Sequence, residues 1–204
     1  MNPFKQGFGE DTDLAVKLLQ QISKSIDCCL ISGTLLGYAR HNAFIPWDDD
    51  IDVLADESQR EIIEGLTDLV VIKENNHFYK VCFKDLGTPI DHIHFNKCVI
   101  NSGIYKFPFV DIFLYKNDQF VNFFYKKWNQ EDILPFVETD FMGITVKIPQ
   151  KPEIFLNRNY PNWKTTIQSN NFNHRTNKPE GKSVTLKNVP PEIINDIKLL
   201  NEFI

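Results

Sequence analysis

The stretch SGTLLGYARHNAFIPWDDDIDV, residues 32–53, decides the fold of this chain. An apolar segment at residues 28–31 comes directly before it and predicts a strand, which Ser32-Gly33 would end in a tight turn. A helix is expected over residues 34–40 and a second strand over residues 47–54. The pattern is therefore strand, turn, helix, loop and a strand rich in aspartate.

The aspartates of the second strand predict a metal site. Successive side chains of a strand point to opposite faces, so Asp48, Asp50 and Asp52 are expected on one face and Asp49 on the other. Carboxylates on one face lie about 6–7 Å apart along the strand, which suits ligation of one divalent cation or a close pair. Ligands that are all oxygen favour Mg²⁺ or Mn²⁺. A solvated acidic strand edge is the structural alternative.

The turn Ser32-Gly33-Thr34 lies between a predicted strand and a predicted helix. Free backbone N–H groups and the positive end of the helix can hold a phosphate at such a turn, although glycine also serves ordinary turns. Arg40 would close the helix and could contact a phosphate or pair with the acidic strand. A surface cation at a helix C-terminus is the alternative for Arg40.

Composition restricts the class of protein and its partners. The 204 residues are enough for one domain with a substantial core. The formal net charge is -5 and the sequence has no dense run of Lys and Arg, which argues against a nucleic-acid partner. We see no signal peptide or membrane span, and the four cysteines form no disulfide framework. We therefore expect a cytoplasmic protein with reduced thiols; a secretory-pathway location stays open if the sequence is truncated.

The rest of the chain predicts further helices and strands. Helices are expected over residues 13–27, 57–66, 151–159 and 193–203, and strands over residues 70–73, 78–83, 90–95, 107–115 and 143–148. About residues 169–188 are rich in Asn, Lys and Pro and predict a mobile loop. We expect a single domain over residues 1–204.

Residues 32–41 followed by residues 44–53 closely resemble the signature of the LicD/fukutin family. The match is strongest over residues 32–53. The resemblance implies the α+β nucleotidyltransferase-like, or polymerase β-like, fold, in which helices flank a mixed β-sheet. Characterised members of the family transfer phosphocholine or ribitol phosphate from CDP-linked donors to glycan hydroxyls, and the resemblance implies the same class of metal-dependent reaction here.

The resemblance also implies roles for individual residues. Ser32-Gly33-Thr34 matches the phosphate turn of the fold, while Asp50 and Asp52 match its Asp-x-Asp metal pair, with Asp48 as an assisting ligand. The fold requires a third acid on a neighbouring strand. Asp111 is the candidate, because its apolar and aromatic neighbours resemble a later element of the family.

Asp91 is the alternative third acid, since it also lies in a predicted strand. His92, His94 and Cys98 follow it at spacings that allow zinc. No fourth ligand is evident, so we interpret both histidines as cleft or packing residues.

Residues 155–163 resemble a family segment that contains Tyr-Gly-Asp and an aromatic residue. Pro161 and Asn162 stand where that segment has Gly and Asp, so we favour packing over acceptor binding for Tyr160 and Trp163.

The expected reaction uses Mg²⁺ or Mn²⁺ at Asp50 and Asp52 to bridge the diphosphate of a CDP-linked or other nucleotide-diphosphate donor. A carbohydrate hydroxyl attacks one phosphorus and the nucleoside monophosphate leaves. Asp111 completes the metal shell or accepts the hydroxyl proton, and Arg40 offsets phosphate charge. Two alternatives remain, a nucleotidyltransferase that releases diphosphate and a catalytically inactive domain that binds a nucleotide or a partner protein.

Overall fold

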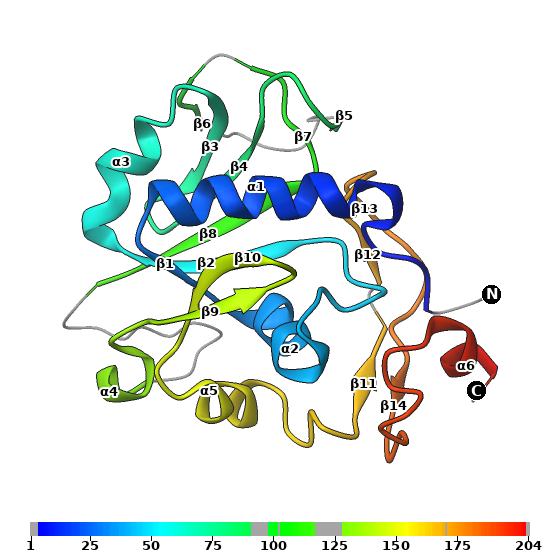
Figure 1. Ribbon diagram of the computed structural model, residues 1–204. Coiled ribbons are helices and arrows are strands. Elements are labelled where there is room, and N and C mark those ends of the chain that lie inside the picture. The colour runs from blue at the N-terminus through cyan, green and yellow to red at the C-terminus, as the bar shows by residue number, and fades with distance from the viewer. Residues whose placement is uncertain (1–3, 91–97, 102, 117–127, 170, 203–204) are drawn as a thin grey trace.

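The computed structural model describes residues 4–90, 98–101, 103–116, 128–169 and 171–202 (Figure 1). The helices of these residues are α1 (Thr12–Ser25), α2 (Ser32–His41), α3 (Arg60–Glu64), α4 (Gln130–Ile133), α5 (Pro152–Asn159) and α6 (Ile197–Glu202), with short 3-10 helices at Gly9–Asp11 and Glu57–Gln59. The larger strands are β1 (Cys28–Leu30), β2 (Ile51–Asp56), β3 (Leu69–Asn75), β4 (Phe78–Phe83), β8 (Phe109–Tyr115), β9 (Val137–Phe141) and β10 (Ile144–Ile148). Two-residue strands are β5 (Thr88–Pro89), β6 (Cys98–Val99), β7 (Lys106–Phe107), β11 (Ile167–Gln168), β12 (Phe172–Asn173), β13 (Lys178–Pro179) and β14 (Thr185–Leu186).

The central sheet has the strand order β1-β2-β8-β4-β3-β6. β2 and β8 run parallel, and every other neighbouring pair of this sheet is antiparallel. The sheet is therefore mixed. The predicted α+β architecture, a mixed β-sheet flanked by helices, is confirmed.

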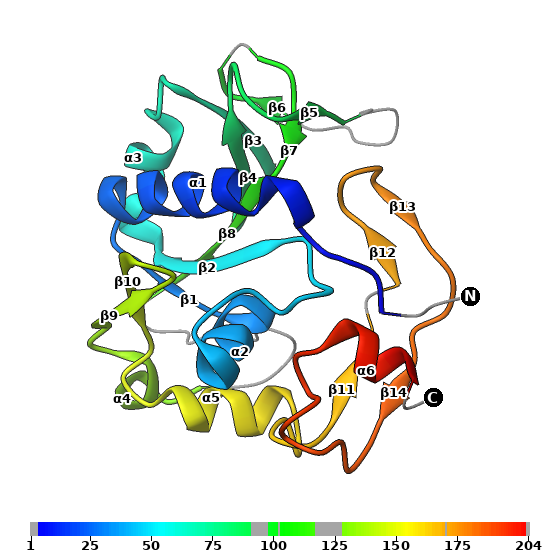
Figure 2. The same ribbon diagram turned by 45° about the vertical axis from the view of Figure 1, so that its right-hand side comes forward.

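Helices pack against the central sheet and hold β2, the strand that carries Asp52, in place. α1 crosses the sheet in both views and buries one stripe of apolar residues, Ala15, Leu18, Leu19 and Ile22 (Figures 1 and 2). This is the stripe expected of an amphipathic helix. α2 packs against β2 on one side and α5 on the other. The start of β2 is thus held between two strands and a helix.

Two element boundaries near the acidic stretch differ from the prediction. α2 begins at Ser32 rather than residue 34, so Ser32-Gly33 forms its first turn. β2 begins at Ile51 rather than residue 47, because its ladder with β8 begins at the pair Ile51 and Val110. Asp48 and Asp50 therefore precede the strand, and strand parity does not determine where they point.

The segment at residues 169–188, predicted as a mobile loop, contains short strands. β12 pairs with β13, and β14 pairs with β11. β9, which the sequence did not predict, pairs with β10 in a hairpin. The closing helix α6 spans Ile197–Glu202 and so begins at Ile197 rather than at the predicted residue 193; residue 203 lies outside the described residues. Most of the predicted strand at residues 90–95 lies outside the described residues.

Two further expectations concern thiols and membranes. Cys28, Cys29 and Cys82 are free and buried. No helix in the described part of the chain is both long and apolar enough to span a membrane.

Candidate active site

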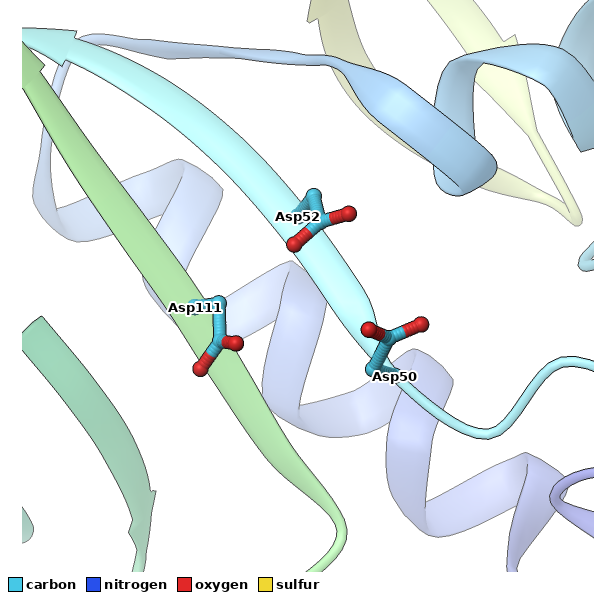
Figure 3. A group of neighbouring side chains, drawn as sticks. All are labelled: Asp50, Asp52 and Asp111. Atoms are coloured by element: carbon cyan, nitrogen blue, oxygen red, sulfur yellow. The ribbon is translucent and has the colours of Figure 1, made fainter. Parts of the chain in front are cut away.

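Three aspartates meet beside the parallel pair of strands. Asp52 on β2 stands opposite Asp111 on β8 in the parallel ladder, and Asp50 directly precedes β2. One carboxylate oxygen from each residue lies within 4.8 Å of the others, and the three side chains point toward a common space (Figure 3). Asp111 is buried, whereas Asp50 and Asp52 are partly exposed. The arrangement offers a cation three oxygen ligands from one side.

Each of these carboxylates makes ionisation of its neighbours less favourable and so raises their pKa. Burial, followed by the charges of Asp50 and Asp111, raises the pKa of Asp52 well above its usual range. Burial raises the pKa of Asp111 to about 6, although the ammonium group of Lys80 acts to lower it. A bound divalent cation would relieve this repulsion, and the all-oxygen donor set is the one that Mg²⁺ and Mn²⁺ prefer. The residues present therefore fit such an ion.

Lys80 is a neighbour that the sequence analysis missed. It lies opposite Asp111 in the antiparallel ladder of β4 and β8. Its Nζ donates to both carboxylate oxygens of Asp111, at 2.6 and 2.8 Å, and lies 4.3 Å from the ring centroid of Phe109. One of the three acids thus already has a cationic partner.

Asp48 lies next to the first turn of α2. A Cβ added to Gly33 would lie 2.3 Å from Asp48 Oδ2, so the carboxylate occupies the space that glycine leaves open. Burial and the charge of Asp50 raise the pKa of Asp48 well above its usual range. Asp48 is not part of the group of three converging carboxylates. The structure thus places an acid beside the turn where a phosphate was predicted.

The other two residues of the predicted phosphate turn occupy different positions. Thr34 is buried, and its Oγ1 accepts a hydrogen bond of 2.9 Å from the backbone N–H of Asp52. This bond ties α2 to β2. Ser32 is also buried, has a φ of 51°, and lines the adjacent cleft.

A cleft of about 490 Å³ opens beside the acids. Its walls come from α2, the acidic segment and the chain that follows α5 and carries β11 and β12; they consist of Ser32, Gly33, Leu36, Arg40, Ile45, Trp47, Asp48, Asp50, Asp52, Asn159, Tyr160, Pro161, Trp163, Thr166, Ile167, Gln168, Ser169, Asn171 and His174. The volume is within the range of small-molecule sites. Acids, one guanidinium group and aromatic rings therefore face a common space.

Arg40 provides the guanidinium group of this cleft. Its Nη2 donates to the carbonyls of Trp163 and Thr166 at 2.6 and 2.8 Å, and Nε donates to the Trp163 carbonyl at 3.2 Å. Burial lowers its pKa to about 10. No ion pair links Arg40 to a carboxylate of the described residues, so the predicted pairing with the acidic strand is not observed. Its charge is held at the cleft by neutral carbonyls.

Tyr160 and Trp163 combine packing with a place in the cleft wall. Trp163 is buried and its Nε1 donates to Asn157 Oδ1 at 3.0 Å. Burial, followed by the charges of Asp52 and Asp48, raises the pKa of the Tyr160 phenol. The packing interpretation therefore describes part of what these two residues do.

Asp49 is not part of the group of three converging carboxylates and contacts His174. Its Oδ2 accepts from the backbone N–H of His174 at 2.9 Å, and its Oδ1 lies 2.6 Å from His174 Nδ1. Sequence analysis missed His174, because it lies in the segment predicted as a loop. Asp91, His92 and His94 lie outside the described residues, as does the side chain of Cys98.

Comparisons with known proteins place these features in context. A family model described as LicD/FKTN/FKRP, nucleotidyltransferase domain, matches residues 25–151. An uncharacterized protein of Rickettsia typhi is 32% identical over 141 residues, covering 65% of this chain and 39% of the relative. One of Rickettsia prowazekii is 31% identical over 137 residues, covering 65% of this chain and 46% of the relative. The chain spans less than half the length of either relative.

Proposed function

The chain belongs to the LicD/FKTN/FKRP nucleotidyltransferase-domain family, and on that premise we propose that it is a metal-dependent phosphotransferase. The proposed reaction moves a phospho-alcohol group of the phosphocholine or ribitol-phosphate type from a CDP-linked donor to a glycan hydroxyl. The observation that carries the proposal is the convergence of the carboxylates of Asp50, Asp52 and Asp111 at a cleft that also holds Arg40.

The proposed cation ligands are Asp50, Asp52 and Asp111. Mg²⁺ or Mn²⁺ held there would neutralise charge on the donor diphosphate and polarise its phosphorus. Asp48 would assist the cation site from the side of α2 through its contact with Asp50, and not as one of the three converging carboxylates. The raised pKa of Asp52 supports this assignment. It shows that the ionised carboxylates destabilise one another, and a bound cation would stabilise their ionised forms.

Arg40 is the proposed partner of the donor diphosphate. Its guanidinium group lines the cleft, and two of its nitrogens are already oriented by the carbonyls of Trp163 and Thr166. Such preorganisation lowers the entropic cost of binding an anion. Trp47 and Trp163 supply apolar wall for the nucleoside. Ser32 and Gly33, at the first turn of α2, line the same cleft and would face the phosphates.

The proposed transfer step is an in-line displacement. The oxygen of the acceptor hydroxyl forms a bond to the phosphorus of the phospho-alcohol group, and the bond from that phosphorus to the bridging oxygen breaks. CMP leaves with the electron pair, and the hydroxyl proton passes to Asp111 or to solvent. If Asp111 is chiefly a ligand, Asp111→Asn weakens Mn²⁺ binding; if it is chiefly the base, Mn²⁺ binding is retained and turnover is lost.

The test is an assay of the products. The protein is incubated with Mg²⁺ or Mn²⁺, a panel of CDP-linked alcohols and a mixture of glycan acceptors. We expect metal-dependent release of CMP, which Asp50→Asn and Asp52→Asn abolish. Release of diphosphate instead would support the nucleotidyltransferase alternative. Absence of turnover with every donor, together with nucleotide binding, would support the inactive binding domain.

A further inference from the structure

The chain that follows residue 151 closes on the acidic site although it lies outside the family-domain match. More than half of the residues that line the cleft come from this extension, residues 152–204. Contacts with the family domain hold the extension: Trp47 Nε1 donates to the Gln168 carbonyl at 2.9 Å, and Arg40 donates to the carbonyls of Trp163 and Thr166. Arg175 pairs with Asp11, which precedes the family domain. The extension is therefore part of the site and not only an appendage.

His174, next to β12 of this extension, contacts two of the aspartates, Asp49 and Asp50. The backbone N–H of His174 donates to Asp49 Oδ2 at 2.9 Å, and His174 Nδ1 lies 2.6 Å from Asp49 Oδ1. The bond at Nδ1 orients the imidazole ring, and the backbone bond holds residue 174 beside Asp49. The ring also packs against Phe109 and Phe172, with centroid distances of 5.8 and 5.0 Å.

The ring fixed in this way directs its other nitrogen at Asp50. His174 Nε2 lies 3.5 Å from Asp50 Oδ2, and the side chains of the two residues are 18% and 21% exposed. One oxygen of Asp50 points toward Asp52 and Asp111 and the other points away from them (Figure 3). Asp50 can thus contact His174 through one carboxylate oxygen and ligate a cation through the other.

We propose that His174 is a positioning residue for Asp50, held by Asp49, so that the extension completes the cation site of the family domain. The inference deepens the proposed function and rests on it. Asp50 precedes β2, so the ladder with β8 does not hold it as it holds Asp52. Outer-shell groups that contact a metal ligand orient it, and their loss commonly weakens metal binding by about 10–100-fold.

Two substitutions separate the two contacts of the ring. His174→Asn keeps a donor nitrogen near the place of Nδ1, so the bond to Asp49 and the closure of the extension can persist while the contact with Asp50 is lost. His174→Gln keeps a donor near the place of Nε2. Arg175→Gln is the control, because it loosens the extension at Asp11 without removing a group that contacts Asp50.

The experiment titrates each metal-free protein with Mn²⁺, measures free Mn²⁺ by electron paramagnetic resonance, and records melting temperatures in EDTA. We expect His174→Asn to weaken Mn²⁺ binding about tenfold or more at an unchanged melting temperature. His174→Gln should lose less affinity than His174→Asn. Arg175→Gln should lower the melting temperature and keep the wild-type affinity.

Two results would overturn the inference. Wild-type Mn²⁺ affinity in His174→Asn would show that Asp50 needs no support from His174. Equal weakening in His174→Asn and Arg175→Gln would show that closure of the extension, and not the imidazole, matters. Wild-type protein that binds Mn²⁺ in this way but transfers no group would refute the proposed function and leave the inference standing; wild-type protein that binds no Mn²⁺ would refute both.

Discussion

Replacing Asp52 by asparagine tests whether the three acids repel one another when no cation is bound. Asparagine keeps the shape of the side chain, and the backbone N–H of residue 52 keeps its bond to Thr34. The carboxylate oxygens lie within 4.8 Å of one another. At this separation two unit charges repel by about 1 kcal/mol in water and by about 3 kcal/mol at an effective dielectric constant of about 20. Lys80 offsets part of this, so we expect the unfolding free energy of the metal-free protein to rise by about 1–2 kcal/mol.

The increase in unfolding free energy caused by Asp52→Asn should itself increase with pH. Burial and the charges of Asp50 and Asp111 raise the pKa of Asp52 in the folded state. The unfolded chain therefore releases this proton at lower pH than the folded protein, and the wild type loses stability as the pH rises from about 4 through the folded pKa. The gain from Asp52→Asn should be small near about pH 4 and larger near about pH 8.

The assay is urea denaturation in EDTA at these two pH values. Asp85→Asn is the matched control, because Asp85 is exposed and its loss removes the same charge away from the site; we expect its effect to stay within about 0.5 kcal/mol. The slope of free energy against urea should stay unchanged. An Asp52→Asn protein less stable than wild type at about pH 8, or an equal gain in Asp85→Asn, would refute the reasoning.

Lys80→Met should lower the unfolding free energy by about 3 kcal/mol near about pH 8, because it leaves the buried Asp111 carboxylate without its partner. Because Lys80 lowers the pKa of Asp111, the loss should shrink as the pH falls toward about 6, where Asp111 takes up a proton even with Lys80 in place; urea denaturation that gives the same loss at every pH would contradict this. Arg40→Gln should weaken CDP binding about tenfold at fixed Mn²⁺ and leave Mn²⁺ binding unchanged, since only the anion loses a charged partner; calorimetry that finds both affinities reduced equally would contradict it. Gly33→Ala would place the new Cβ 2.3 Å from Asp48 Oδ2, the end of a partly exposed side chain that can turn aside, so we expect the unfolding free energy to change by no more than about 1 kcal/mol; a loss of several kcal/mol in urea denaturation would contradict this.

Local sequence pattern was sufficient for the strand, turn and helix around residue 32 and for the strand that carries Asp52. Apolar neighbours on both sides of Asp52 and Asp111 indicated buried strands, and the family resemblance indicated which acids belong together. Asp48, Asp50 and Asp52 line one cleft and Asp49 does not, which agrees with strand parity, although alternation in the sequence does not show where the ladder with a partner strand begins. That ladder begins at Ile51.

Two neighbours of the acidic residues could not be predicted, because contacts between distant segments place them there. Lys80 meets Asp111 through the pairing of β4 with β8, across 31 positions of the chain. His174 meets Asp49 across 125 positions. No local periodicity encodes either contact, and the composition of residues 169–188 predicted a loop where short strands carry His174 to the site.

The most direct test of the central claim is to locate the cation. Crystals soaked with Mn²⁺ and CDP should give one anomalous scattering peak bounded by the carboxylates of Asp50, Asp52 and Asp111, with the diphosphate between that peak and Arg40. A saturating Mn²⁺ soak with no peak among these three carboxylates, or with CDP bound away from Arg40, would contradict the account.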